Sequence, residues 1–444
     1  MKYQSRVDLI LRYQLAILLF ASTGNASIQA QIPTKRGDLI QEFESIRDNM
    51  PNRDSEGFVP PTSEELAKWR SVIQAMLAEN WSDAYTLIQT DFPEYELFQY
   101  TDTGNDDAVY YFVREKTPVT KGWGTFVFAT SYLRQLAIET PHPIYDTNTY
   151  KQSPDMFRLT GARYLIMAGT HRCANSAISG CDGTSSSCGG AYKVSDMAHS
   201  VNTFFQITHE EIAKFNDKTY QVQIHGHSQS SCEDIFLSNG HNTVVMDQLL
   251  ALRDHILTNT ALTCEVAGQS SCTLVASTNV QGRFTNGVRS NPCNSYASAQ
   301  NITGYFIHAE QTRTVRDNPG QYGKFAEALN KIIPLTSNQT AVQTKKNTEF
   351  PQGFMLNEAY PNPFNLKTNI TIELPVSASI NIMIVNSAGS TIRKLVSGTN
   401  LASGTHIFQW NGRNDMGQVL ASGPYLIQME AGTFHQTKKV IFAK

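Results

Sequence analysis

Four short apolar runs in this chain have the composition of β-strands, and each leads into a histidine or an acidic residue. Open α/β sheets place their binding sites beyond the carboxyl ends of their strands. We therefore expect these polar side chains to gather at one edge of a sheet, where they can form a metal site. The runs and the residues after them are Ala137–Thr140 before His142 and Asp146, Tyr164–Ala168 before His171, Tyr220–Ile224 before His225 and His227, and Tyr305–Ile307 before His308 and Glu310.

Segments with helical periodicity alternate with the strand-like runs. The main candidates are 196–215, with Ser195 as its N-cap, 243–257 and 322–333, and a capping box at Thr62 and Glu65 begins an earlier helix. This alternation predicts an α/β domain at 32–335, with a mixed, mostly parallel sheet and flanking helices. Within it, residues 32–130 form a cap, an N-terminal extension or additional strands of the sheet.

The first thirty residues resemble a secretory signal peptide. Basic Lys2, Arg6 and Arg12 precede a short apolar stretch, Leu15–Ala21, and small residues follow it. That stretch is too short to span a bilayer, and no later stretch approaches transmembrane length. We therefore expect export through the periplasm, removal of residues 1–30, and a mature chain without a transmembrane segment that is secreted or attached to the cell surface.

Cysteine usage and charge agree with an exported protein that does not bind nucleic acid. The chain has seven cysteines and a net charge of -3, and it contains no dense basic run. Spacing makes Cys181–Cys188 and Cys264–Cys272 plausible local disulfides, although the pairing cannot be deduced from spacing alone. The absence of a CxxC motif argues against a cysteine-based zinc ribbon.

The end of the chain has a different pattern. Residues 336–353 are polar and form a predicted linker. Short alternating runs separated by turn residues then predict a small β-sandwich at 354–444. The runs are Ile370–Leu374, Ile380–Val385, His406–Trp410, Tyr425–Met429 and Lys439–Phe442.

Motifs in this sandwich resemble the type A C-terminal sorting domain of the type IX secretion system, which has an immunoglobulin fold like that of FlgD. The motifs are Tyr360–Asn365, Asn386–Gly389, Trp410–Gly417, Ala421–Tyr425 and Thr437–Val440. Leu366 stands where the family usually has proline. The resemblance implies export by the type IX machinery, and it implies nothing about activity.

Histidine and aspartate at two strand ends are the candidate metal ligands. Prolines on both sides of His142 hold the backbone extended, and the following loop can bring Asp146 to the same side. Strict alternation puts His225 and His227 on one face of their strand, and one of the two is the third ligand. Neutral imidazole and carboxylate are ordinary ligands of zinc, so Zn²⁺ is the predicted cofactor.

Other polar residues at the strand ends are candidates for catalysis. Glu310 suits the role of general base, because a metal-bound water must lose a proton as it attacks. Arg313 and Arg316 could hold a substrate carboxylate through paired hydrogen bonds. His171 could line the same crevice, although a structural role for it is equally consistent with the sequence.

The order of three strand ends resembles N-formylglutamate amidohydrolase and related zinc amidases and carboxypeptidases, which have a phosphorylase/hydrolase-like fold. These strand ends are Pro141-His142, Ile224–His227 and Glu310–Arg313. The resemblance implies a zinc hydrolase that cuts an amide bond in a peptide, an acyl-amino acid or peptidoglycan, and the export signal implies that this hydrolase is secreted. The alternative is a non-enzymatic surface or binding protein braced by disulfides. A serine hydrolase is disfavoured because no GxSxG motif occurs.

Overall fold

The computed structural model describes residues 31–443 apart from 337–352, 360, 366, 377 and 402–403. The predicted signal peptide and nearly all of the predicted linker lie outside these residues. The chain divides into two compact units, residues 1–339 and 340–444. No helix in the described part of the chain is long and apolar enough to cross a membrane.

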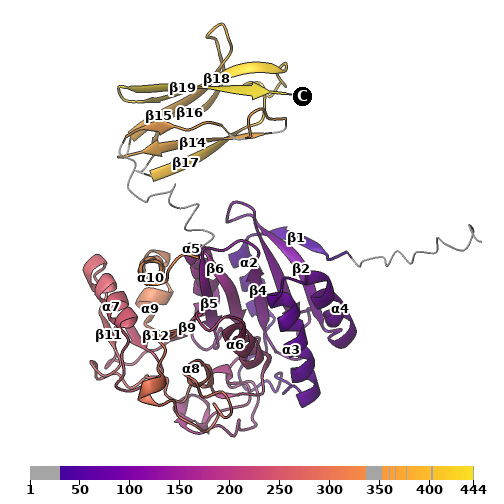
Figure 1. The fold of residues 1–444 in the computed structure, drawn as a ribbon, viewed down its shortest axis with the longest axis vertical. Coiled ribbons are helices and arrows are strands. Elements are labelled where there is room, and N and C mark those ends of the chain that lie inside the picture. Colours follow the sequence, from indigo (N-terminus) through magenta and orange to yellow (C-terminus); the bar gives the residue numbers. More distant parts are fainter. Residues whose placement is uncertain are drawn as a thin grey trace, which may run out of the picture. The chain divides into compact units, whose positions relative to one another are not determined.

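The first unit is built on a ten-stranded mixed sheet with the order β1-β2-β3-β4-β6-β5-β9-β12-β10-β11 (Figure 1). Parallel pairing joins β6, β5, β9 and β12 at its centre. The strands are β1 (Thr34–Gly37), β2 (Tyr95–Asp102), β3 (Ala108–Glu115), β4 (Thr125–Ala129), β5 (Arg134–Thr140), β6 (Ala162–Met167), β9 (Tyr220–Gly226), β10 (Ile235–Ser238), β11 (Cys264–Val266) and β12 (Phe306–Gln311).

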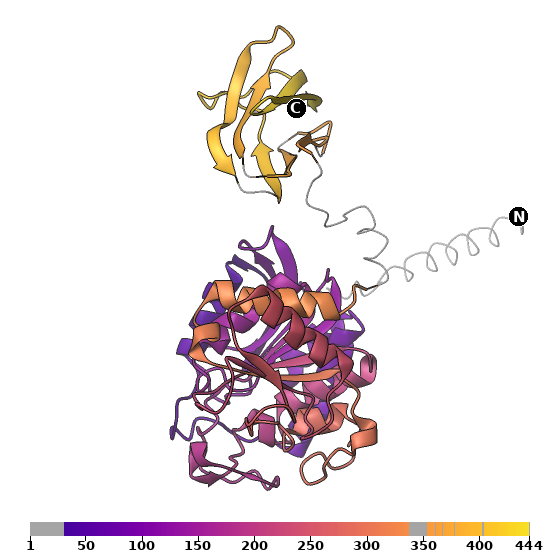
Figure 2. The same cartoon turned by 90° about the vertical axis from the view of Figure 1, so that its left-hand side faces the viewer.

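Helices cover both faces of this sheet, so the central strands are buried on both sides (Figures 1 and 2). One apolar cluster joins the sheet to α2 (Leu39–Asp48), α5 (Thr149–Thr160), α7 (Asp247–Asn259) and α10 (Pro319–Ile332). A second cluster joins the other face to α3 (Ser63–Leu77), α4 (Trp81–Asp91) and α6 (Phe204–Phe215). The short helices α8 (Val280–Thr285) and α9 (Arg313–Arg316) and the small hairpin of β7 (Thr184–Ser185) and β8 (Gly190–Ala191) complete the unit.

The predicted fold class is confirmed, and residues 32–130 extend the sheet. This segment contributes β1 to β4, which form one side of the sheet, together with α2 to α4. The predicted capping box is present, since Thr62 Oγ1 accepts from the amide of Glu65 while the Glu65 carboxylate accepts from the amide of Thr62.

One helix boundary is wrong in the sequence interpretation. The helix predicted from residue 196 begins at Phe204, where Thr203 is the N-cap. Ser195 instead donates to the carbonyl of Arg172 and accepts from the amide of Asn175. The side chain that looks like a cap therefore binds the loop 172–175.

The local disulfides expected from spacing are also wrong. The pairs are Cys173–Cys188, Cys181–Cys293 and Cys232–Cys272, and the remaining cysteine, Cys264, is a buried thiol. Cys264 lies in β11 within the first apolar cluster, where it packs as a small apolar side chain. The seventh cysteine is therefore unpaired because it is an apolar side chain of the core.

The second unit is an antiparallel sandwich with its own apolar core. One sheet has the order β13-β14-β17 and the other the order β16-β15-β18-β19. All five predicted strands are present, and the 11-residue β16 was not predicted. The strands are β13 (Met355–Leu356), β14 (Thr368–Leu374), β15 (Ala378–Val385), β16 (Thr391–Leu401), β17 (Gly404–Trp410), β18 (Gly423–Ala431) and β19 (Phe434–Phe442).

A buried ion pair ties together the end of β2, the start of α2 and the end of α5. The Arg158 guanidinium contacts Asp102 at 2.5 Å and Asp38 at 2.8 Å. Asp102 is fully buried and also accepts from the amide of Leu39. Loss of the arginine would leave that carboxylate charged and unpaired, which is the costly way to break a buried pair.

We expect Arg158→Met to lower the free energy of unfolding by about 3–5 kcal/mol. Arg36→Met is the control, because the Arg36–Asp107 pair is exposed and its loss costs less than about 1 kcal/mol. Urea unfolding of both variants measures the difference. Equal losses in the two variants would show that the Arg158 pair contributes no more than a surface pair.

Candidate metal centre

The register of three parallel strands lines up polar residues on one face of the sheet. Glu139 of β5 lies beside Gln223 of β9, which lies beside His308 of β12. In the next row towards the carboxyl edge, His225 lies beside Glu310. Because side chains alternate between the faces of a strand, these residues point to one side and the apolar neighbours to the other.

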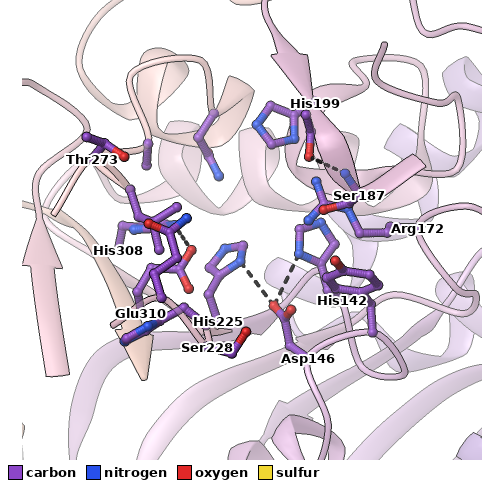
Figure 3. A pocket seen from close by; sticks show the side chains of 18 of the residues that line it. His142, Asp146, Arg172, Ser187, His199, His225, Ser228, Thr273, His308 and Glu310 are labelled. Atoms are coloured by element: carbon purple, nitrogen blue, oxygen red, sulfur yellow. Dashed lines mark hydrogen bonds and ion pairs between the residues drawn. The ribbon is translucent and has the colours of Figure 1, made fainter. Parts of the chain in front are cut away.

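His142, Asp146 and His225 come together at this edge. The amide of Asp146 donates to the carbonyl of His142 at 2.9 Å, and this turn brings the two side chains together. Asp146 Oδ2 lies 3.2 Å from His142 Nδ1 and 3.4 Å from His225 Nδ1. Each residue offers one ligand atom, and these atoms lie within 4.8 Å of one another (Figure 3). All three residues are buried, so they form a compact set of potential metal ligands shielded from solvent.

Asp196 lies behind His142. Its Oδ1 is 2.9 Å from His142 Nε2 and 3.0 Å from His199 Nδ1, and its Oδ2 accepts from Arg172 at 2.5 Å. Burial raises the pKa of Asp196, but the charges of Arg172 and the histidines outweigh it and hold this pKa well below its usual range. A carboxylate on the outer nitrogen of a ligand histidine is the common way to fix that ring towards a metal.

Electrostatics distinguishes the two histidines of the group. Burial and Arg172 lower the pKa of His142, but Asp196 and Asp146 reverse this and raise it overall. Burial is the main reason that the pKa of His225 falls to about 4, although Asp146 acts against it. His225 is therefore a neutral imidazole near pH 7, which is the form that binds metals.

Glu310 and His308 lie on the other side of His225. With His225 they form a second group of ligand atoms within 4.8 Å of one another, and Glu310 Oε1 is 3.6 Å from His308 Nε2. Glu310 Oε2 and His308 Nδ1 are buried and make no hydrogen bond. Burial, followed by the charge of Asp146, raises the pKa of Glu310 to about 8. At this pKa the carboxyl group is mostly protonated near pH 7, and the positive charge of a metal ion bound beside it would lower the pKa.

A cavity of about 840 Å³ opens over these residues. Its floor contains His142, Asp146, His225, His308 and Glu310 (Figure 3). Its walls are loops rich in hydroxyl and amide side chains, 184–187, 228–229 and 273–279. All three disulfides end in or next to these loops or join the segments that carry them. The cavity is therefore lined mainly by polar side chains.

The remaining predicted site residues have different positions. His227 lines the cavity, but its Nε2 faces the carbonyl of Glu233 at 2.9 Å, and it belongs to neither ligand group. His171 packs against Tyr145, and its Nδ1 accepts from the amide of Cys173. The described residues that line the cavity do not include His171.

Arg313 and Arg316 both line the cavity. Arg313 is exposed and pairs with Asp317 at 2.7 Å. Arg316 is buried and donates to the carbonyls of Gln311 and Thr147. A side chain at Gly226 would collide with the Arg316 guanidinium, so glycine at this position allows the arginine to reach the strand end.

Sequence reasoning missed Asp196 as a site residue. Its position directly after Ser195 indicated a helix start, and nothing in the local pattern connected it with His142. The only signal was the spacing of polar residues in the long segment after β6. The contact from Asp196 to Arg172 and His142 depends on how that segment folds back.

Comparisons with known proteins support the fold of the second unit. Residues 361–434 match the family model of the FlgD Ig-like domain. This match confirms an Ig-like domain at the predicted place, while its class as a type IX sorting domain stays a prediction. Comparison with curated proteins gave no match.

Among solved structures, the similarities are partial and distant. PorZ of Porphyromonas gingivalis, a surface component of the type IX secretion system, is 18% identical over 22% of this chain and 12% of PorZ, with a TM-score of 0.16. PorU of the same organism is 15% identical over 20% of this chain and 9% of PorU, with a TM-score of 0.17. This chain thus spans a small fraction of either protein.

N-formylglutamate amidohydrolase of Ralstonia eutropha JMP134 is 10% identical, with a TM-score of 0.28. The similarity covers 51% of this chain and 99% of that enzyme. At these identities and scores, none of the three structures carries information about the chemistry of this chain. The case for function therefore depends on the residues of the site.

Proposed function

We propose that this protein is a zinc-dependent hydrolase that cuts an amide bond. The observation that carries the proposal is the convergence of three buried ligand atoms, from His142, Asp146 and His225, on the floor of a polar cavity. Two imidazoles and one carboxylate leave the fourth position of a tetrahedral ion open for water or substrate, as in catalytic zinc sites. Asp196 supports His142 from behind, as such ligands require.

The chemistry of the site follows from its charges. Bound zinc would lower the pKa of a coordinated water and polarise the substrate carbonyl. Glu310 accepts the proton of the attacking water and passes it to the leaving nitrogen of the amide. Its position beside His225 suits both transfers, and the charge of bound zinc would lower its raised pKa so that the carboxylate can accept the proton. Arg316, fixed by two backbone carbonyls at the cavity, is the proposed partner of an anionic group on the substrate.

The substrate classes that fit are a peptide, an acyl-amino acid or a peptidoglycan fragment. The walls of the cavity present mainly hydroxyl and amide groups, which favour polar substrates over long acyl chains. A non-enzymatic, disulfide-braced binding protein is the alternative, because the three disulfides brace the same walls. Metal content separates the two proposals.

We expect the purified protein to contain one zinc ion per chain, and His142→Ala to lose it. His227→Ala is the matched control, because His227 lies at the same strand end but outside the ligand group. Elemental analysis of the three proteins measures the content. A folded wild-type protein that takes up no zinc would overturn the proposed function, and loss of zinc from the control alone would overturn the ligand assignment.

We expect Glu310→Gln to retain zinc and to lower kcat by about 10²–10⁴-fold, the usual contribution of a general base. The amide keeps the size of the side chain but cannot take up the proton. Amine release from a panel of N-acyl-amino acids, dipeptides and peptidoglycan fragments identifies a substrate and measures the loss. Full activity of the variant on that substrate would exclude Glu310 as the base.

We also propose that residues 354–444 direct export by the type IX secretion machinery. The tail motifs, the Ig-like family match and the three disulfides support this location. In a bacterium with this machinery, we expect a chain ending at residue 353 to stay in the periplasm, folded by its own core. Immunoblots of cell fractions measure the distribution, and surface exposure of the shortened chain would contradict the proposal.

A further inference from the structure

A buried glutamine lies directly behind the candidate ligand His225. Gln223 precedes His225 by two residues on the same face of β9 and is fully buried. Its Nε2 donates to Glu139 Oε2 at 3.0 Å and to Gln281 Oε1 at 3.1 Å. Its Oε1 faces Asn279 Nδ2 at 2.7 Å and His225 Nε2 at 3.2 Å. The amide group therefore has four partners. Its nitrogen faces two side-chain oxygen atoms, and its oxygen faces two side-chain nitrogen atoms.

Glu139 fixes the direction of this amide from one side. Its Oε1 lies 2.8 Å from His209 Nδ1, and His209 Nε2 lies 3.0 Å from the carbonyl of Gln281. A carbonyl only accepts, so His209 Nε2 carries a hydrogen. His209 Nδ1 and Glu139 Oε1 lie at hydrogen-bond distance, so one of these two atoms must carry a second proton. Glu139 Oε2 thus has only lone pairs, and Gln223 must turn its NH₂ group towards it.

Asn279 fixes the same direction from the other side. It is the N-cap of α8, and its Oδ1 accepts from the amide of Gly282 at 2.8 Å. Its NH₂ group consequently points to Gln223 and requires an oxygen there. Glu139 and Asn279 therefore require the same orientation of the Gln223 amide, in which Oε1 faces His225.

This orientation determines the tautomer of His225. Since Gln223 Oε1 accepts, His225 Nε2 carries the hydrogen, and the lone pair of the neutral ring lies on Nδ1. That nitrogen is 3.4 Å from Asp146 Oδ2, inside the candidate ligand group. A hydrogen bond on one nitrogen of a histidine commonly decides which nitrogen binds a metal.

We infer that Gln223 is a positioning residue, which holds His225 in the Nε2–H form and so sets the affinity of the site for zinc. Glu139 and Asn279 act through it. The inference rests on the proposed function, because it concerns the ligand that the proposal assigns to His225. It adds Gln223 and Glu139, which belong to neither ligand group and do not line the cavity, and Asn279, which lies in the cavity wall.

The test compares Gln223→Met with Gln221→Met in the full chain. Gln221 is a matched control, because it is also fully buried on the same face of β9. It donates to the carbonyl of His209 and accepts from Thr285, and neither of these contacts involves His225. Thermal unfolding shows whether both variants fold.

We expect Gln223→Met to weaken zinc binding by about 10–100-fold in chelator competition, the usual effect of losing such a partner. The control should bind zinc as the wild-type protein does. In metal-free protein labelled with ¹⁵N-histidine, His225 should be the Nε2–H tautomer in the wild type and the control, and a mixture in Gln223→Met. Assignment comes from the signal that His225→Ala removes.

Unchanged affinity in Gln223→Met, or equal loss in both variants, would overturn the inference and leave the proposed function standing. A wild-type protein without zinc affinity would overturn the proposed function, and the tautomer measurement would still decide the role of Gln223. If Gln223→Met does not fold, Asn279→Asp replaces it. That variant keeps the capping oxygen but removes the NH₂ group that orients Gln223, so the same weakening is expected.

Discussion

The in-register parallel pairing of β5, β9 and β12 is the constraint on which the candidate site depends. A shift of one residue in β9 would turn His225 to the opposite face of the sheet. The apolar side of the same strands sets the register, since Ile138, Val222 and Ile307 pack together in one core cluster. The packing of one face therefore positions the polar groups of the other.

Burial of the polar face imposes a second constraint. Each polar group there needs a hydrogen-bond partner, because an unpaired buried polar group lowers the free energy of unfolding. Glutamine and asparagine side chains meet this constraint behind the site, where they pair with Glu139, His209 and one another. Three buried atoms without partners belong to residues that line the cavity: His227 Nδ1, His308 Nδ1 and Glu310 Oε2. These three atoms are therefore the unsatisfied buried polar groups among the described residues that line the cavity.

The sequence predicted the parts of this arrangement that follow from local periodicity. Alternation placed His225 at a strand end, the two prolines indicated a constrained, extended backbone at His142, and the strand and helix pattern predicted the fold class. It could not predict Asp196, since that contact depends on the path of a long segment between β6 and α6. The prediction of the disulfide pairing was wrong for the same reason. Spacing favours short loops, whereas Cys181 pairs with Cys293, 112 residues away.

The candidate ligands and the cavity walls lie on different kinds of backbone segment. The candidate ligands stand on strand ends or on a tight turn, which core packing holds in place. The walls are mainly loops, and the one apolar cluster beneath them is small, formed by Phe236, Ala267 and Cys272 with Leu274 and Val275 packed against it. Such loops are mobile unless they are tied down. Covalent links supply part of that restraint, and the buried Arg283 supplies more by binding Asp182 and the carbonyls of Ser277 and Pro292. The disulfides thus restrain the walls of the cavity, while the candidate ligands on its floor are held by the sheet, by the turn after β5 and by Asp196 behind His142.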